Sequence, residues 1–164
     1  MKEVTPSGEQ PHRQRLRLAS FDYADQDNVY FVTIRAVHGS VPFHDPDLAL
    51  AVVETLLRQR QTGRLRVYAY VLMPDHLHAA VSVAGGEDSL PAVLKDFKSY
   101  TTRLAWKRGL AGVLWQRSFY DHIARRAEDL LAICEYILAN PVRSGLAREV
   151  SDWPYSGVLD QLPI

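Results

Sequence analysis

The chain has 164 residues, of which 47% are hydrophobic and 23% charged, the composition of an ordinary globular protein of one domain. The numbers of acidic and basic residues are equal, so the zero net charge excludes a chain-wide positive field that would attract polyanions. The single Cys134 excludes both an internal disulfide and a cysteine cluster for zinc. No long apolar run and no apolar N-terminal segment is present, so we expect no membrane span, no signal peptide and a cytoplasmic location.

The basic residues are nevertheless clustered along the chain. Such clusters bind phosphate backbones or form solvated faces, and composition alone leaves both interpretations open. The clusters comprise Arg13, Arg15 and Arg17, then Arg58, Arg60, Arg64 and Arg66, and finally Lys95, Lys98, Arg103, Lys107 and Arg108.

The first half of the chain predicts one strand and one helix after a polar start. Residues 1–11 read as a loose tail, and His12 to Leu18 as an arm that lies on a sheet edge or on DNA. The β-branched and aromatic run from Val29 to Val37 predicts a central, buried strand. Asp47 to Gln61 has apolar residues at helical spacing, and Gly63 ends the predicted helix.

Two further strands, Arg66 to Met73 and His76 to Val83, flank the turn signal Pro74-Asp75. A second helix is expected to begin at Asp88 or Ser89 and to run to about Arg108. The rest of the chain predicts a fourth strand, a third helix stopped by Pro141 and a packed turn, at Leu114 to Ile123, Glu128 to Asn140 and Trp153 to Ser156.

This order of elements is β, α, β, β, α, β, then α. It predicts an α+β fold of the ferredoxin-like, split βαβ type, with an antiparallel sheet, helices on one face and an appended C-terminal helix. No linker or internal repeat divides the chain, so residues 1–164 are expected to form one domain. The uncovered sheet face is the expected place for a substrate.

His76 and His78 follow the predicted turn directly. Side chains on a strand alternate between faces, so residues two apart present both imidazoles to one side. Imidazole is the commonest metal ligand in proteins, and two on one face form half of a divalent-metal site. The alternative is that the pair only caps a strand end and hydrogen-bonds to water.

Tyr136 and Asn140 are four residues apart on the third helix and therefore share one helical face. Tyrosine is a known covalent nucleophile, and an amide oxygen is a ligand for hard divalent cations. The alternative is structural: the ring of Tyr136 packs on the sheet, and Asn140 ends the helix before Pro141.

Taken together, these segments resemble the REP-associated tyrosine transposases, single-tyrosine relatives of the insertion-sequence transposases among the His-hydrophobe-His nucleases. The resemblance covers most of the chain. It rests on R-L-R-L-A-S-F-D-Y (15–23), V-L-M-P-D-H-L-H (71–78), W-Q-R-S-F-Y-D-H-I (115–123), E-Y-I-L-A-N-P-V-R-S-G (135–145) and S-D-W-P-Y-S (151–156). Each segment is weak alone, and their order and spacing make the match specific.

The resemblance implies that His76, His78 and Asn140 hold Mg²⁺ or Mn²⁺ and that Tyr136 is the nucleophile. His122 also matches a family histidine, either behind the metal ligands or in contact with DNA, and Tyr120 is a rival nucleophile by residue type. The implied partner is a single-stranded, hairpin-forming DNA repeat. Its phosphate contacts are expected from Arg13, Arg15, Arg17, Lys95, Lys98, Arg103, Arg125 and Arg126.

Other classes remain open from the sequence. A DNA- or RNA-binding regulatory protein without catalysis would use the same fold, although no RNA-recognition signature is present. A metallohydrolase would use metal-bound water in place of Tyr136. No Walker-type glycine loop is present, so no nucleotide cofactor is expected. The chain is expected to act as a monomer or homodimer, with Tyr136 reaching the histidines of its own chain or of a partner.

Overall fold

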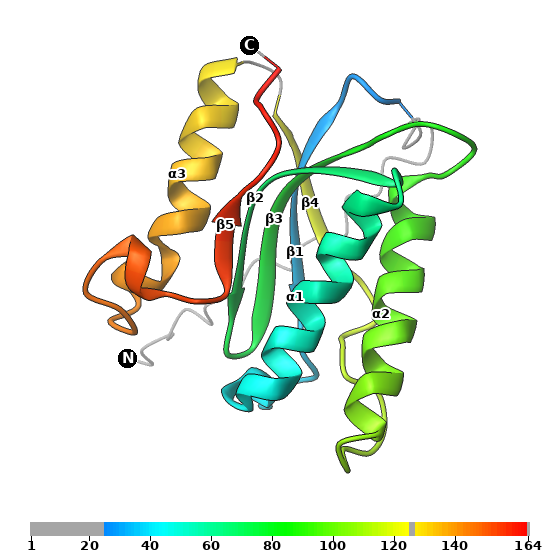
Figure 1. Ribbon diagram of the computed structural model, residues 1–164, viewed down its shortest axis with the longest axis vertical. Helices are drawn as coiled ribbons and strands as arrows, with labels where there is room; N and C mark the ends of the chain where they lie inside the picture. Colours follow the sequence, from blue (N-terminus) through cyan, green and yellow to red (C-terminus); the bar gives the residue numbers. More distant parts are fainter. Residues whose placement is uncertain (1–24, 125–126, 164) are drawn as a thin grey trace, which may run out of the picture.

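An antiparallel sheet organises the described part of the chain, which is residues 25–124 and 127–163 of the computed structural model (Figure 1). Its strand order is β4-β1-β3-β2-β5, and every neighbouring pair is antiparallel. The strands are β1 Val29–Arg35, β2 Leu65–Met73, β3 His76–Val83, β4 Tyr120–Ala124 and β5 Ser156–Val158. The first four have the order of a split βαβ fold, so the ferredoxin-like prediction is confirmed.

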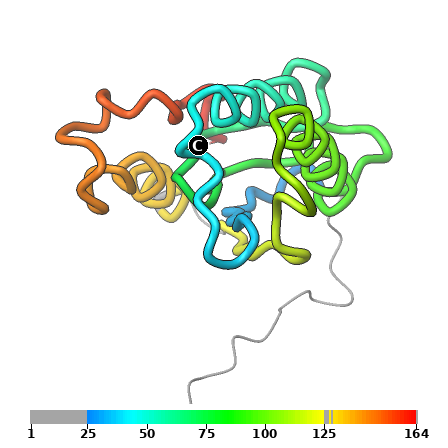
Figure 2. The backbone as a smooth tube through the Cα atoms, turned by 90° about the horizontal axis from the view of Figure 1, so that it is seen from below, coloured from blue at the N-terminus to red at the C-terminus, as the bar shows by residue number. Residues whose placement is uncertain are grey.

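Helices cover both faces of this sheet. α1 (Pro46–Gln61) connects β1 to β2, and α2 (Leu90–Trp106) connects β3 to β4. These two pack side by side on one face, whereas α3 (Ala127–Arg143) packs on the other, mainly over β2 and β3 (Figures 1 and 2). The face expected to receive the substrate is therefore partly covered by α3, and α3 leaves β1 and β4 more open than β2 and β3. None of the described helices is long and apolar enough to span a membrane.

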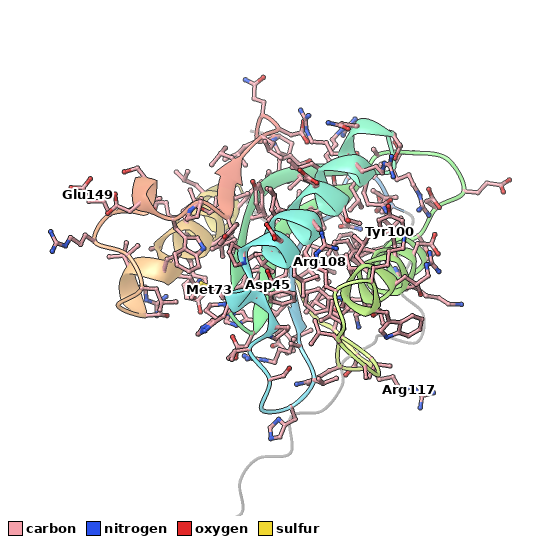
Figure 3. The ribbon with its side chains drawn as sticks, turned by 60° about the horizontal axis from the view of Figure 1, so that its bottom comes forward. Asp45, Met73, Tyr100, Arg108, Arg117 and Glu149 are labelled. Carbon is pink, nitrogen blue, oxygen red and sulfur yellow. The ribbon has the colours of Figure 1, made fainter. Side chains whose placement is uncertain are left out.

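Strand alternation divides the apolar residues into two cores. In β1 and β3, Ile34, Leu77 and Val81 point to α1 and α2, and Phe31 and Ala80 point to α3. Side chains fill the space between the sheet and the helices on both sides (Figure 3). Both faces of β3 are thus buried, which explains why its sequence is almost continuously apolar apart from the histidines and Ser82.

A β-bulge in β2 shifts the register between Val67 and Ala69. The extra residue lets Tyr68 and Ala69 both join the core beneath α3. The Tyr68 hydroxyl is then buried beside the Ser82 hydroxyl, with 2.9 Å between the oxygens. The bulge thereby supplies a large side chain to the α3 side of the sheet without leaving its hydroxyl unpaired.

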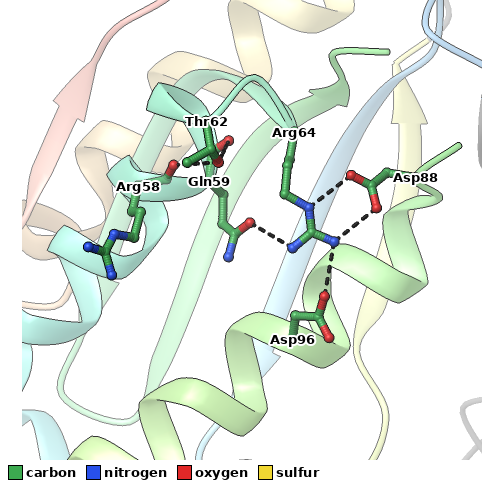
Figure 4. Close-up of polar contacts among 6 residues, drawn as sticks. All are labelled: Arg58, Gln59, Thr62, Arg64, Asp88 and Asp96. Carbon is green, nitrogen blue, oxygen red and sulfur yellow. Dashed lines mark hydrogen bonds and ion pairs between the residues drawn. The ribbon is translucent and has the colours of Figure 1, made fainter. Parts of the chain in front are cut away.

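The helices on the other face are fixed at their ends by polar groups. Asp45 caps α1, because its carboxylate accepts hydrogen bonds from the backbone N–H groups of Asp47 and Leu48. Arg64, at the start of β2, donates to both oxygens of Asp88 and to Asp96 of α2 (Figure 4). The hydrogen bonds to Asp88 raise the pKa of the Arg64 guanidinium and lower that of the Asp88 carboxyl.

The predicted strand from Leu114 to Ile123 is wrong in its first half, since β4 begins only at Tyr120. Leu114 and Trp115 are buried, but Trp115 makes only an isolated bridge to Ala36 and donates its indole N–H to Thr101. The backbone then turns along α2, where Lys98 donates to two of its carbonyls. The apolar character of Trp115 therefore reflects its burial between α2 and the sheet and does not indicate a strand.

The prediction that Pro141 stops the third helix is also wrong. Pro141 lies inside α3, which continues to Arg143. The helix ends in a Schellman motif, in which Gly145 has a φ of 72° and the N–H of Leu146 donates to the Pro141 carbonyl at 2.8 Å. Gly145 is the stop signal, and proline, which lacks an N–H, is tolerated two residues before the last helical one.

The predicted packed turn at Trp153 to Ser156 is confirmed as packed, but it leads into a strand that the sequence analysis missed. Ser156 begins the short edge strand β5, which pairs with β2. Trp153 donates its indole N–H to the Leu72 carbonyl at 3.0 Å. The expected N-terminal tail and arm, residues 1–18, lie outside the described residues, and the one-domain expectation stays a prediction.

We expect Arg64→Met to lower the free energy of unfolding by about 1 kcal/mol, because it removes a bidentate ion pair that joins β2 to the start of α2. Urea denaturation measures the change. The control is Arg58→Met, which removes an exposed arginine from α1 and should change the midpoint far less. Equal effects of the two substitutions would show that the ion-pair cluster does not stabilise the fold.

Candidate active site

His76 and His78 lie at the start of β3, directly after the Pro74-Asp75 turn, on the sheet face that carries α3. His78 is buried, with 7% of its surface exposed, and the side chain of His76 is 14% exposed. Leu77 points to the opposite core, so the alternation expected from the sequence is present. The same face therefore holds both imidazoles.

The two imidazoles are held by oxygens at Nδ1 and face each other at Nε2. His76 Nδ1 lies 2.5 Å from the Asp75 carboxylate, and His78 Nδ1 lies 2.8 Å from the Thr33 hydroxyl. The two Nε2 atoms are 3.1 Å apart. Because an ionised carboxylate only accepts hydrogen bonds, it fixes the proton of His76 on Nδ1 and leaves the Nε2 lone pair available.

Burial keeps His78 neutral. Desolvation, with smaller contributions from the charges of His76 and Arg35, lowers its pKa to about 3. A neutral imidazole has a lone pair at every pH at which proteins are normally studied, as a metal ligand requires. Thr33 can accept from Nδ1 or donate to it, so it suits either tautomer of His78.

Helix α3 brings Tyr136 to this pair. Buried Leu130, Cys134 and Ile137 seat the helix on the sheet, and the half-exposed ring of Tyr136 lies beside His78, with 6.1 Å between ring centroids. The Tyr136 ring also packs edge-on against Phe31. The sequence-predicted tyrosine and histidines therefore come together within one chain.

Asn140 lies one turn beyond Tyr136 on α3 and is buried. Its amide nitrogen donates to the Tyr136 carbonyl at 2.9 Å, so the amide oxygen is the atom left to act as a ligand. Asn140 does not terminate the helix, which excludes that structural explanation of its presence. Its role as a metal ligand stays a prediction.

The donor set fits a hard divalent cation. Ligands at adjacent positions of an octahedron with metal bonds of about 2.1 Å lie about 3.0 Å apart, close to the separation of the two Nε2 atoms. Among the described residues, no group of three or more His, Cys, Asp and Glu side chains is arranged so that it could hold a metal ion by itself. A cation bound between the two Nε2 atoms would take both imidazoles and oxygens from water or substrate, and the amide oxygen of Asn140 stays the predicted third protein ligand.

Sequence reasoning missed two arginines at this site. Arg143 lies over the Tyr136 ring, with its guanidinium carbon 4.6 Å from the ring centroid. Arg35 is opposite His76 in the β1–β3 register. The seven-residue spacing from Tyr136 would have placed Arg143 on the same helical face, whereas Arg35 depends on a strand register that the sequence does not specify.

Tyr120 and His122 lie on β4, across β1 from His78. The register pairs Tyr120 with Thr33 and His122 with Phe31, so both side chains share the sheet face of the histidine pair. Both are exposed. The hydrogen bonds to the Nδ1 atoms of the histidine pair come from Thr33 and Asp75, and not from His122. The rival tyrosine is separated from His78 by a whole strand, whereas Tyr136 packs against it.

The predicted DNA-contacting residues are spread over different parts of the molecule. Lys95, Lys98 and Arg103 belong to α2, on the opposite face of the sheet from the histidines. The Lys98 ammonium donates to the Gln116 and Arg117 carbonyls, and Arg117 itself points away from the body of the molecule (Figure 3). The remaining candidates, Arg13, Arg15, Arg17, Arg125 and Arg126, lie outside the described residues.

A hollow of about 260 Å³ lies near the end of α2, lined by side chains such as Val41, Ala105, Leu110 and Val113. It is on the other side of the sheet and contains none of the candidate residues. The His–Tyr cluster instead lies on the opposite sheet face, beside α3.

The fold and the site together define a class: an α+β protein whose central strand carries a histidine pair facing a helix-borne tyrosine. The profile of the family described as "Transposase IS200 like" matches residues 31–140, two thirds of the chain. The chain belongs to this family.

Relatives and solved structures agree with that membership. The REP-associated tyrosine transposase of Escherichia coli K12 is 29% identical over 101 residues, which are 62% of this chain and 59% of that protein. An uncharacterized protein of Haemophilus influenzae is 24% identical over 80% of this chain and 89% of its own length. A solved REP-associated tyrosine transposase bound to a REP hairpin has the same fold, with a TM-score of 0.67, 24% identity and coverage of 82% of this chain and 78% of that one.

We expect metal-free protein to lose stability on acidification through His78. Between about pH 3 and 6.5 the unfolded chain carries a proton on this imidazole and the folded chain does not, so unfolding takes up a proton and becomes easier as the pH falls. The expected loss from pH 7 to pH 5 is about 2 kcal/mol. Urea denaturation at both pH values should show it for wild type and not for His78→Gln.

His122→Gln is the control for this measurement, since it removes an exposed histidine from the same sheet face. It should retain the pH dependence of wild type. If His78→Gln retained it too, the buried imidazole would not be the group responsible.

Proposed function

We propose that this protein is a metal-dependent single-strand DNA endonuclease and strand transferase that cleaves beside a short hairpin through a 5′-phosphotyrosine. The observation that carries the proposal is the packing of the Tyr136 ring against His78, whose Nε2 converges with that of His76. A nucleophile thus lies next to two imidazole nitrogens that can bind a metal ion. The hairpin substrate is inferred from the REP hairpin bound to the structural relative.

In this reaction the Tyr136 hydroxyl oxygen attacks the scissile phosphorus and loses its proton. The bond from phosphorus to the 3′ oxygen breaks, and the 3′ oxygen leaves and takes up a proton. The new phosphotyrosine ester keeps the phosphodiester energy, so a later attack by a 3′-OH restores the DNA strand and frees the tyrosine. No nucleotide cofactor is needed.

The chain's own residues orient the reacting groups. Phe31 and His78 fix two sides of the Tyr136 ring, and Asp75 and Thr33 fix the histidine rings. Mg²⁺ or Mn²⁺ held by His76, His78 and Asn140 would supply Lewis-acid stabilisation of charge on the phosphate. The open face over β1 and β4 gives an unpaired strand access to the tyrosine, which a duplex would not have as easily.

Tyr136→Phe should form no covalent protein–DNA adduct with a hairpin that carries a single-stranded flank, while it still binds the hairpin. Phenylalanine keeps the ring packing against Phe31 and His78 and removes only the hydroxyl. Denaturing gel electrophoresis of labelled DNA detects the adduct. Tyr120→Phe is the matched control and should still form it; the reverse result would place the nucleophile on β4.

His76→Ala should abolish adduct formation in Mg²⁺ or Mn²⁺ and leave hairpin affinity within about twofold, since it removes a proposed metal ligand and no phosphate contact. Chelation of the metal should reproduce the defect in wild type. Adduct formed by His76→Ala at the wild-type rate would contradict the metal assignment. Hydrolysis without an adduct in wild type would favour metal-bound water as the nucleophile.

A further inference from the structure

Arg35 and Arg143 are the two guanidinium groups closest to the His–Tyr cluster along β1 and α3. Within the described part of the chain, neither is paired with a carboxylate. The contrast with the other side of the sheet is clear, because Arg60 and Arg64 are both neutralised there by aspartates. An arginine without a carboxylate partner in the protein can bind an anionic ligand without first breaking an ion pair. The ligand expected at this site is anionic.

Arg143 continues the helical stripe of Tyr136 and Asn140, one turn further on. Its guanidinium covers the face of the Tyr136 ring at 4.6 Å, a cation–π contact that limits the directions the ring can take. The Schellman motif that carries α3 past Pro141 is what keeps residue 143 helical. The C-terminal end of α3 therefore places the positive charge of Arg143 beside Tyr136, the proposed nucleophile.

Arg35 approaches from the other side of the cluster. It is the last residue of β1, it is exposed although β1 is a central strand, and it lies opposite His76 in the ladder. Arg35 is thus on the same sheet face as the histidine pair, on the part of that face that α3 leaves more open.

We infer that Arg35 and Arg143 form a phosphate clamp that binds the non-bridging oxygens of the phosphate to which Tyr136 becomes joined. The inference rests on the proposed function. Guanidinium groups suit the role because each presents a planar fork of N–H donors that matches two phosphate oxygens. Arg143 also acts as a positioning residue, since the side chain that binds the phosphate holds the tyrosine ring beside it.

The clamp predicts that loss of either arginine lowers the rate of adduct formation much more than the affinity for the hairpin. Arg35→Met and Arg143→Met, which keep the apolar stem and remove the charge, should each slow single-turnover adduct formation by about tenfold or more. Hairpin affinity should change by less than about threefold, since most of the phosphate contacts lie elsewhere. Arg143→Lys should recover part of the rate, because an ammonium retains the charge without the fork.

Arg58→Met is the matched control, an exposed arginine removed from α1 on the opposite layer. It should leave the rate unchanged. A second measurement distinguishes phosphate binding by Arg143 from a purely structural role. It is the affinity for uncleaved hairpin, measured in the Tyr136→Phe protein, which cannot cleave the DNA. With a neutral methylphosphonate at the cleavage position mapped for wild type, affinity should fall severalfold, and further loss from Arg35→Met or Arg143→Met should disappear.

The outcomes distinguish this inference from the proposed function. If wild type forms the adduct at Tyr136 but both methionine variants react at the control rate, the clamp is wrong and the nuclease stands. The clamp is equally wrong if the methylphosphonate and Arg35→Met weaken binding independently. Failure of wild type to form any adduct would instead overturn the proposed function on which the clamp rests.

Discussion

The burial of β3 between two layers is the constraint on which the rest of the molecule depends. Its side chains alternate between a purely apolar core under α1 and α2 and a mixed surface under α3. A shift of one residue in its pairing would move Leu77 into the site and His78 into the apolar core. The hydrophobic residues of β3 therefore set the face on which the histidines lie, because a shift by one residue would bury an imidazole without a partner.

Much of this arrangement could be predicted from the sequence because its signals are local. The alternation around His76 and His78 and the helical spacing of Tyr136 and Asn140 specify which side chains share a face, and the element order specifies the sheet topology. The long-range contacts could not be predicted in the same way. The pairing of Thr33 with His78 joins residues 45 apart, and no local pattern marks one threonine of β1 among its neighbours.

The wrong boundaries have a common origin in residues with more than one structural use. Trp115 is apolar and follows a glycine-rich loop, which is typical of a strand, but its ring fills a core position under α2. Pro141 usually ends a helix, yet its carbonyl here receives the hydrogen bond that closes the Schellman motif at Gly145. For Trp115 tertiary packing outweighs the local preference, whereas for Pro141 a second local signal, the cap at Gly145, determines where the helix ends.

The separation of two cores by one sheet also has a practical consequence. Substitutions beneath α1 and α2, such as those that would fill the hollow beside Val41 and Leu110, reach the His–Tyr cluster only through the backbone of the sheet. That half of the molecule can be redesigned for heat resistance or crystallisation while the chemistry on the other half is left in its natural form. Directed evolution of this chain would accordingly begin with the layer that carries none of the candidate catalytic or metal-binding residues.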